Sequence, residues 1–272
     1  MRRSWRISEW MVPDSPLRST ETENESEVRM SWSNRLMSEL DARATVLETS
    51  HGAVQVAREG RGPPVLASHG GPGGFDQGLA YCRHLLDGGC ELLAVSRPGY
   101  LRTPLEAGRT PESQADLYAA ILDAFEIQRA AILGFSSGGP SATHFAARHP
   151  DRTSALFLDS AILLPYDTPI GAFRRATLES SFFAWLSYQI VARRPELMIR
   201  FVIEGVSSGL SKEQKRTAAD WIRSDPDRLR SFQGLFASIA PWKYREAGWT
   251  NDQVNERHLP PLPFADIIAP TL

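Results

Sequence analysis

Residues 130–139 read AAILGFSSGG, and this segment decides the fold that we predict for the 272-residue chain. A short apolar run ends in GFSSG at residues 134–138, and a helical pattern follows at 141–148. The pattern G-x-S-x-G is weak by itself, but its position between a strand and a helix is what a nucleophile elbow requires. The segment therefore predicts that Ser136 is a nucleophile at the carboxyl end of a central strand. A serine-glycine turn without catalysis is the alternative interpretation.

The glycines and the proline of this segment have physical reasons for their positions. We expect Gly134 and Gly138 to lie where the strand and the helix pass too close together for side chains. Pro140 falls in the first turn of the expected helix, where its missing N–H is harmless. The positive end of that helix would then face the nucleophile and favour negative charge there.

A second glycine-rich segment, HGGPGG at residues 69–74, follows the apolar run at 64–68. An oxyanion hole needs two backbone N–H groups that point to the place where negative charge develops. One such N–H belongs to the residue after the nucleophile, here Ser137, and the other to a loop of this kind, here Gly71. We expect His69, Gly70 and Gly73 to support Gly71. A plain glycine-rich turn is the alternative, and the spacing does not fit the dinucleotide-binding pattern G-x-G-x-x-G.

Outward from these two segments, short apolar runs alternate with helical patterns. The runs expected to be strands lie at 43–48, 53–57, 64–68, 91–95, 130–135 and 154–158. Helical patterns lie at 78–86, 112–125 and 141–148. Strands that alternate with helices predict an α/β fold, in which a mostly parallel sheet carries helices on both faces. We place this core at residues 41–164.

Three further parts flank the core. Residues 1–40 form an N-terminal extension, which we predict to be disordered or weakly helical and dispensable for the fold, because TETENESE at 20–27 is acidic and aperiodic. Residues 165–262 lack strand-like runs, and apolar residues recur at helical spacing from Phe173 to Ile190. This part contains four of the seven tryptophans, which either form its core or line a substrate pocket. Residues 263–272 are expected to begin a seventh strand. Further helices are expected at 196–206, 212–223 and 226–238.

Four segments together resemble the α/β-hydrolase superfamily over about residues 43–272. They are PPVLASHGGPGG, AVSRPGYLRTPL, AAILGFSSGGPSATHFAARHPDR and DIIAPTL. The HGGPG sequence is most similar to the proline-iminopeptidase-like branch. The resemblance implies an α/β-hydrolase fold with a helical cap at 165–262 after the sixth strand, and it implies Ser136 as nucleophile with Gly71 and Ser137 as oxyanion donors. Peptidases of that branch usually have Trp where this chain has Ser137, so we expect hydrolysis of a small acyl ester, amide or short peptide.

The resemblance also implies a catalytic acid after the seventh strand and a histidine after the eighth. Both would lie beyond Leu272, so the final strands and helix are expected to be missing and the chain is expected to be truncated, with little or no activity. Asp159, at the end of the sixth strand, and His258 are weak candidates for a substitute acid and base. The alternative is a non-catalytic or inactive member of the fold that at most binds a small ligand.

The composition excludes several other functions. Hydrophobic residues make up 42%, charged residues 23%, and the net charge is −2, which is ordinary for a soluble domain and does not favour a nucleic-acid partner. The two cysteines form neither a disulfide framework nor a metal site, and no motif predicts a cofactor. No apolar run approaches the ~20 residues of a membrane span, and no secretory signal is recognisable, so we expect a cytoplasmic protein. Substrate identity and oligomeric state do not follow from the sequence.

Overall fold

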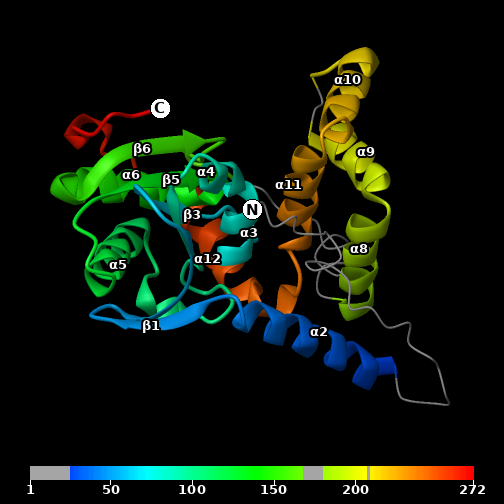
Figure 1. Ribbon diagram of the computed structural model, residues 1–272, viewed down its shortest axis with the longest axis horizontal. Coiled ribbons are helices and arrows are strands. Elements are labelled where there is room, and N and C mark those ends of the chain that lie inside the picture. The colour runs from blue at the N-terminus through cyan, green and yellow to red at the C-terminus, as the bar shows by residue number, and fades with distance from the viewer. Residues whose placement is uncertain (1–24, 168–179, 207–208) are drawn as a thin grey trace.

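A six-stranded sheet forms the centre of the computed structural model, which describes residues 25–167, 180–206 and 209–272 (Figure 1). The strand order is β1-β2-β4-β3-β5-β6. Strands β3 to β6 run parallel, while β2 is antiparallel to both β1 and β4. The strands are β1 Thr45–Thr49, β2 Gly52–Gly60, β3 Pro64–Ser68, β4 Glu91–Val95, β5 Ala130–Phe135 and β6 Thr153–Asp159. The predicted α/β fold with a mostly parallel sheet is confirmed.

Helices cover both faces of this sheet because the central strands are apolar on both sides. On one face, α5 Pro111–Ala124 and α6 Gly139–Arg148 enclose a core with Leu66, Leu93 and Ile132. On the other face, α2 Glu25–Asp41 and α3 Phe75–Tyr81 enclose a core with the alternate residues of the same strands. Each face of the sheet therefore has its own hydrophobic core.

The helix predicted at 78–86 is wrong in its boundaries. The chain forms α3 and then a short α4, Arg83–Asp87, with a turn at Cys82 between them. Cys82 is buried in the core beside Leu79, and Leu85 and Leu86 pack against the same core. The turn lets both short helices place apolar side chains against the sheet, which one straight helix from 78 to 86 would not do.

The extension predicted at 1–40 to be disordered or weakly helical is helical in its described part, and whether it is dispensable stays a prediction. Residues 25–41 form α2, whereas residues 1–24 lie outside the described residues. Met37 and Leu40 are only 1% and 5% exposed and belong to the core that α3 shares. Leu36 packs with Tyr188 of the helices that follow β6. The spacing of Leu36, Met37 and Leu40 gives α2 one apolar face, and burial of that face stabilises the helix.

In residues 165–262, called the helical insertion below, the described residues form helices joined by turns and loops, with no strand among them. Phe173 and Leu178, where the helical spacing was predicted to begin, lie outside the described residues. Helix α11 contacts α3, while Ile199, Ile203 and Ala219 form a small core of the insertion itself. Figure 1 shows α8 to α11 standing to one side of the sheet, with α12 close to the sheet. The insertion contains α8 Ser181–Arg193, α9 Pro195–Val206, α10 Lys212–Arg223, α11 Pro226–Ala237, η4 Trp242–Tyr244 and α12 Glu246–Arg257.

After the insertion the chain returns to the edge of the sheet beside β6. A short helical turn, η5 Phe264–Asp266, comes first. The Leu156 N–H then donates to the Pro270 carbonyl at 2.9 Å, and the Leu272 N–H donates to the Leu156 carbonyl at 3.0 Å. Thr271 thus makes a parallel bridge with Leu156. Over residues 25–167, 180–206 and 209–272, no helix has both the length and the apolar character needed to cross a bilayer.

Candidate active site

The two glycine-rich segments leave the sheet side by side. Strands β3 and β5 are adjacent and parallel, and Ser68 at the end of β3 pairs with Gly134 near the end of β5. The carboxyl ends of these strands therefore meet at one edge of the sheet. In open α/β sheets, ligands bind in the crevice at such an edge. We call residues 69–74 the oxyanion loop and residues 136–138 the nucleophile turn.

Ser136 has the strained backbone that the elbow interpretation requires. Its φ is +49°, in the left-handed region that residues other than glycine seldom adopt. The Ser136 carbonyl accepts a hydrogen bond of 3.0 Å from the Ile162 N–H, which holds the turn against the chain that follows β6. Strain of this kind persists only where the surrounding structure enforces it, and it is common at functional sites.

Two glycines let the nucleophile turn approach its neighbours. A Cβ atom at Gly138 would lie 2.2 Å from the Ser68 carbonyl oxygen. A Cβ atom at Gly134 would lie 2.7 Å from the Cβ of Ala142 on α6. Both distances are far below van der Waals contact, so only glycine fits at either position, as the sequence predicted. The close approach brings the nucleophile turn and the oxyanion loop together.

Four carbonyl groups of the oxyanion loop accept hydrogen bonds from side chains of the described residues. The pairs are Arg97 Nε to His69 O at 2.8 Å, His69 Nδ1 to Gly70 O at 2.6 Å, Gln77 Nε2 to Pro72 O at 3.4 Å and Arg245 Nη1 to Gly73 O at 2.6 Å. In contrast, the Gly71 N–H donates to no group in the described part of the chain. The loop thus keeps that donor available for a ligand.

His69 fixes the direction of the Gly71 N–H. The Gly70 carbonyl and the Gly71 N–H belong to one planar trans peptide unit and point in opposite directions. The His69 Nδ1–H donates to that carbonyl, while its Nε2 accepts a hydrogen bond of 3.0 Å from the Arg97 N–H. Burial, together with the charge of Arg97, holds the pKa of His69 well below its usual value. His69 is therefore a neutral support for the loop rather than a base for Ser136.

Ser137 and two residues of α12 complete the surroundings of Gly71. A Cβ atom at Gly71 would lie 2.8 Å from the Trp249 ring and 3.1 Å from the Ser137 hydroxyl oxygen. Glu256 is 4% exposed, and its Oε1 atom has no hydrogen-bond partner in the described residues. Burial first, and then the charge of Asp252, raise the pKa of Glu256 to about 7, although a hydrogen bond from Ser137 lowers it. Helix α12 therefore brings a buried carboxyl group to the side chain of Ser137.

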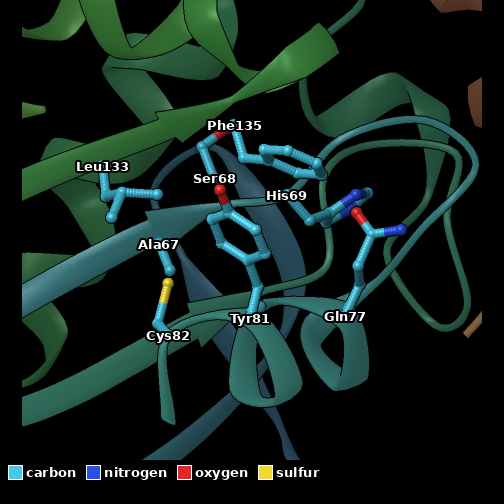
Figure 2. Close-up of a pocket in the computed structure, with 9 residues that line it drawn as sticks. Ala67, Ser68, His69, Gln77, Tyr81, Cys82, Leu133 and Phe135 are labelled. Carbon is cyan, nitrogen blue, oxygen red and sulfur yellow. The ribbon is translucent and has the colours of Figure 1, made fainter. Parts of the chain in front are cut away.

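A pocket beside the oxyanion loop is filled by packing. Figure 2 shows the Tyr81 ring rising from α3 toward Phe135, with His69 and Gln77 beside one another. The rings of Tyr81 and Phe135 stack with their centroids 4.2 Å apart. The space between these residues has no room for a water molecule. The packed side chains therefore hold the strand that leads to Ser136 in place, and the space between them is too small for a substrate.

Neither substitute candidate is hydrogen-bonded to Ser136 in the described residues, although Asp159 pairs with Phe135, the residue before Ser136. Asp159 is exposed and accepts hydrogen bonds from the Tyr81 hydroxyl and from Ser160 Oγ. His258 is exposed at the end of α12. The Ser136 hydroxyl makes no hydrogen bond to any described residue. All six histidines of the chain are among the described residues, so none of them is hydrogen-bonded to Ser136. The same residues contain no group of three or more His, Cys, Asp or Glu side chains placed to bind a metal.

The sequence prediction missed four buried residues that surround the oxyanion loop. Their signal is weak because each pairs with a residue far away in the chain. Arg97 lies in the RPGY segment after β4, whereas the others lie in the insertion, in helical sequence with few apolar residues. They are Arg97, Arg245, Asp252 and Glu256.

Comparisons with known proteins match this fold and this region. The alpha/beta hydrolase fold family matches residues 63–188. The uncharacterized hydrolase YcgS of Bacillus subtilis (strain 168) is 32% identical over 127 residues, which span 47% of this chain and 44% of that protein. An alpha/beta hydrolase fold protein from Nakamurella multipartita is 36% identical with a TM-score of 0.78, covering 84% of this chain and 79% of that one. A thermophilic esterase from Thermogutta terrifontis, solved with malate bound, is 20% identical with a TM-score of 0.52. The match covers 84% of this chain and 78% of that one.

The chain belongs to the α/β-hydrolase fold family, because a relative 36% identical matches most of both chains. This confirms the superfamily that the four segments predicted. The likeness to the esterase, at 20% identity, shows the fold alone. The match to YcgS spans less than half the length of that protein.

Proposed function

We propose that this protein is a serine hydrolase that cleaves a small acyl ester, amide or short peptide through an acyl-enzyme on Ser136. The observation that carries the proposal is the juxtaposition of a strained Ser136 with a loop in which side chains bind four carbonyls, while the Gly71 N–H has no acceptor among the described residues. A serine nucleophile favours acyl transfer, because its ester intermediate is readily hydrolysed.

The proposed reaction has two steps. Ser136 Oγ attacks the substrate carbonyl carbon and gives up its proton to a base, and the Gly71 and Ser137 N–H groups stabilise the resulting oxyanion. The intermediate collapses, the bond to the alcohol or amine breaks, and the leaving group takes up a proton. Water then attacks the acyl-serine, which releases the carboxylic acid and restores the Ser136 hydroxyl.

Binding of a small ligand without turnover is the second candidate. The observation in its favour is that the Ser136 hydroxyl has no hydrogen bond to any of the six histidines. A serine hydroxyl is a weak nucleophile until a base accepts its proton. The two candidates therefore differ in whether Ser136 reacts once a base is provided.

Labelling with a small alkyl fluorophosphonate, with and without imidazole as an external base, tests the proposal. The purified chain should form a covalent adduct at Ser136, identified by peptide mass spectrometry, and imidazole should accelerate its formation. Ser136→Ala should abolish the adduct. Ser154→Ala, a change at an exposed serine of β6, is the matched control and should leave labelling unchanged.

An adduct that persists in Ser136→Ala would place the nucleophile elsewhere and overturn the proposal. If the unsubstituted chain forms no adduct even with imidazole, the proposal fails and the ligand-binding candidate is favoured.

A further inference from the structure

Two buried arginines from other parts of the chain hold the two ends of the oxyanion loop. Arg97 follows β4, and Arg245 lies between η4 and α12; their exposed fractions are 1% and 0%. Arg97 Nε donates to the His69 carbonyl at 2.8 Å, and Arg245 Nη1 donates to the Gly73 carbonyl at 2.6 Å. Gly71 lies between these two points, so the arginines hold the loop on either side of its free N–H.

A carboxylate fixes the plane of each guanidinium group. Arg97 Nη1 and Nη2 donate to the two oxygens of Asp252, at 2.7 and 2.5 Å. Arg245 Nη1 and Nη2 donate to the two oxygens of Asp76, at 3.0 and 2.9 Å. A bidentate pair restricts the orientation of the guanidinium more than a single contact does, and lysine cannot reproduce it. The N–H that reaches the loop carbonyl is therefore held in one direction.

The insertion supplies one partner of each pair. Asp252 lies on α12, and Arg245 directly precedes this helix. The helix is docked by its backbone, since the Gly248 N–H donates to the Gly99 carbonyl at 2.9 Å and the Leu101 N–H donates to the Tyr244 carbonyl at 2.6 Å. The segment from η4 to α12 is thus joined to the loop after β4 as well as to the oxyanion loop.

We propose that Arg97 and Arg245 are positioning residues that aim the Gly71 N–H at the oxyanion, with Asp252 and Asp76 holding their guanidinium groups. This inference rests on the proposed function, because it assigns a role in stabilising the transition state. Arg97 acts on the loop twice, through its side chain on the His69 carbonyl and through its N–H on the His69 ring. A donor that is misaligned weakens binding of the transition state more than binding of the substrate, so kcat falls while KM is nearly unchanged.

The test compares lysine and asparagine variants in imidazole-assisted hydrolysis of p-nitrophenyl acetate, with the rate of Ser136→Ala subtracted. Arg97→Lys and Arg245→Lys keep the charge but lose the guanidinium N–H that reaches the loop carbonyl and the bidentate pair that orients it. Each should lower kcat about 10- to 100-fold, with KM changed by less than about threefold. Asp252→Asn and Asp76→Asn leave the arginine beside its carbonyl and should lower kcat less. Arg148→Lys, in the exposed pair with Asp116, is the matched control and should leave kcat unchanged.

Hydrogen–deuterium exchange of a peptide that covers residues 69–76 provides a readout without turnover. Exchange should be faster in the two lysine variants than in the unsubstituted chain or in Arg148→Lys. The inference is overturned if the lysine variants lose thermal stability but keep both kcat and the exchange rate of the loop. If the unsubstituted chain shows no Ser136-dependent turnover, the proposed function fails, and the exchange measurement alone decides whether the arginines hold the loop.

Discussion

The oxyanion loop and the nucleophile turn meet at one edge of the sheet, but the fold holds them differently. The loop continues into α3, whose core also contains residues of α2, while the turn continues into α6 on the opposite face. Protein donors bind the loop carbonyls, whereas the Ser136 hydroxyl has no partner in the described residues. On the proposed function, the difference means that the fold already positions the groups that would stabilise an oxyanion, while the described contacts set no proton acceptor for Ser136.

The contact between the two regions is the place where one substitution should have the largest effect. In Gly138→Ala the new Cβ would lie 2.2 Å from the Ser68 carbonyl oxygen, and the φ of −79° suits any residue, so the cost is steric. We expect the free energy of unfolding, measured by urea denaturation, to fall by about 4 kcal/mol or more, or the variant to yield no folded protein. Gly209→Ala, which has no atom within 4 Å, is the control. Equal stability of the two variants would contradict the close approach.

A substitution in the core below the oxyanion loop should have the next largest effect on stability. Met37 of α2 is buried in the core that it shares with Phe75 and Leu79 of α3. Met37→Ala should lower the free energy of unfolding by about 2–4 kcal/mol, because the surrounding side chains fill the cavity only in part. Glu39→Ala, at an exposed position of the same helix, should change it by less than about 0.5 kcal/mol. A Met37→Ala variant as stable as the parent would support the prediction that the extension is dispensable.

The buried carboxyl group of Glu256, next to Ser137, should make the free energy of unfolding depend on pH. Its pKa is raised to about 7 in the folded chain from a usual 4.5, so between these values the folded state binds a proton that the unfolded state does not. Its stabilising contribution is therefore full below pH 4.5 and is lost as the pH rises through 7. Relative to the parent, Glu256→Gln should gain on the order of 1–3 kcal/mol in free energy of unfolding between pH 5 and pH 9.

Urea denaturation at several pH values measures this gain, with Glu246→Gln, an exposed position on the same helix, as the control for loss of a charge. The groups that face Glu256 are Asp252 of its own helix, Arg97 after β4 and Ser137 after β5. A constant difference between parent and Glu256→Gln across this range would show that the carboxyl group is ionised throughout.

The parts of the fold that the sequence predicts are those with a local signal. The apolar runs at 64–68, 91–95 and 130–135 coincide with β3, β4 and β5, because strands buried on both faces must be continuously apolar. The two glycine-rich segments are recognisable for the same reason, since each turn directly follows one of these strands. In the structure β3 and β5 are adjacent and parallel, which brings Gly71 and Ser136 to one edge of the sheet.

The parts that the sequence does not predict depend on contacts between distant residues. Helix α12 was missed because its buried residues are Gly248, Asp252 and Glu256, which give no apolar period. Asp252 pairs with Arg97, 155 positions away, and only the folded chain reveals such a pair. Helix α2 was predicted only as disorder or weak helix, because the acidic stretch before it outweighed the short apolar spacing near its end.

Hydrolysis of p-nitrophenyl acetate by the purified chain and by Ser136→Ala, with and without imidazole, tests the central claim most directly. Without imidazole, the two proteins should show equal rates near the background, because no histidine is hydrogen-bonded to Ser136. With imidazole, the unsubstituted chain should exceed Ser136→Ala by about 10-fold or more, since an external base completes a site whose oxyanion donors are in place. Fast turnover that depends on Ser136 but needs no imidazole would contradict the account and would show that this chain positions its own base.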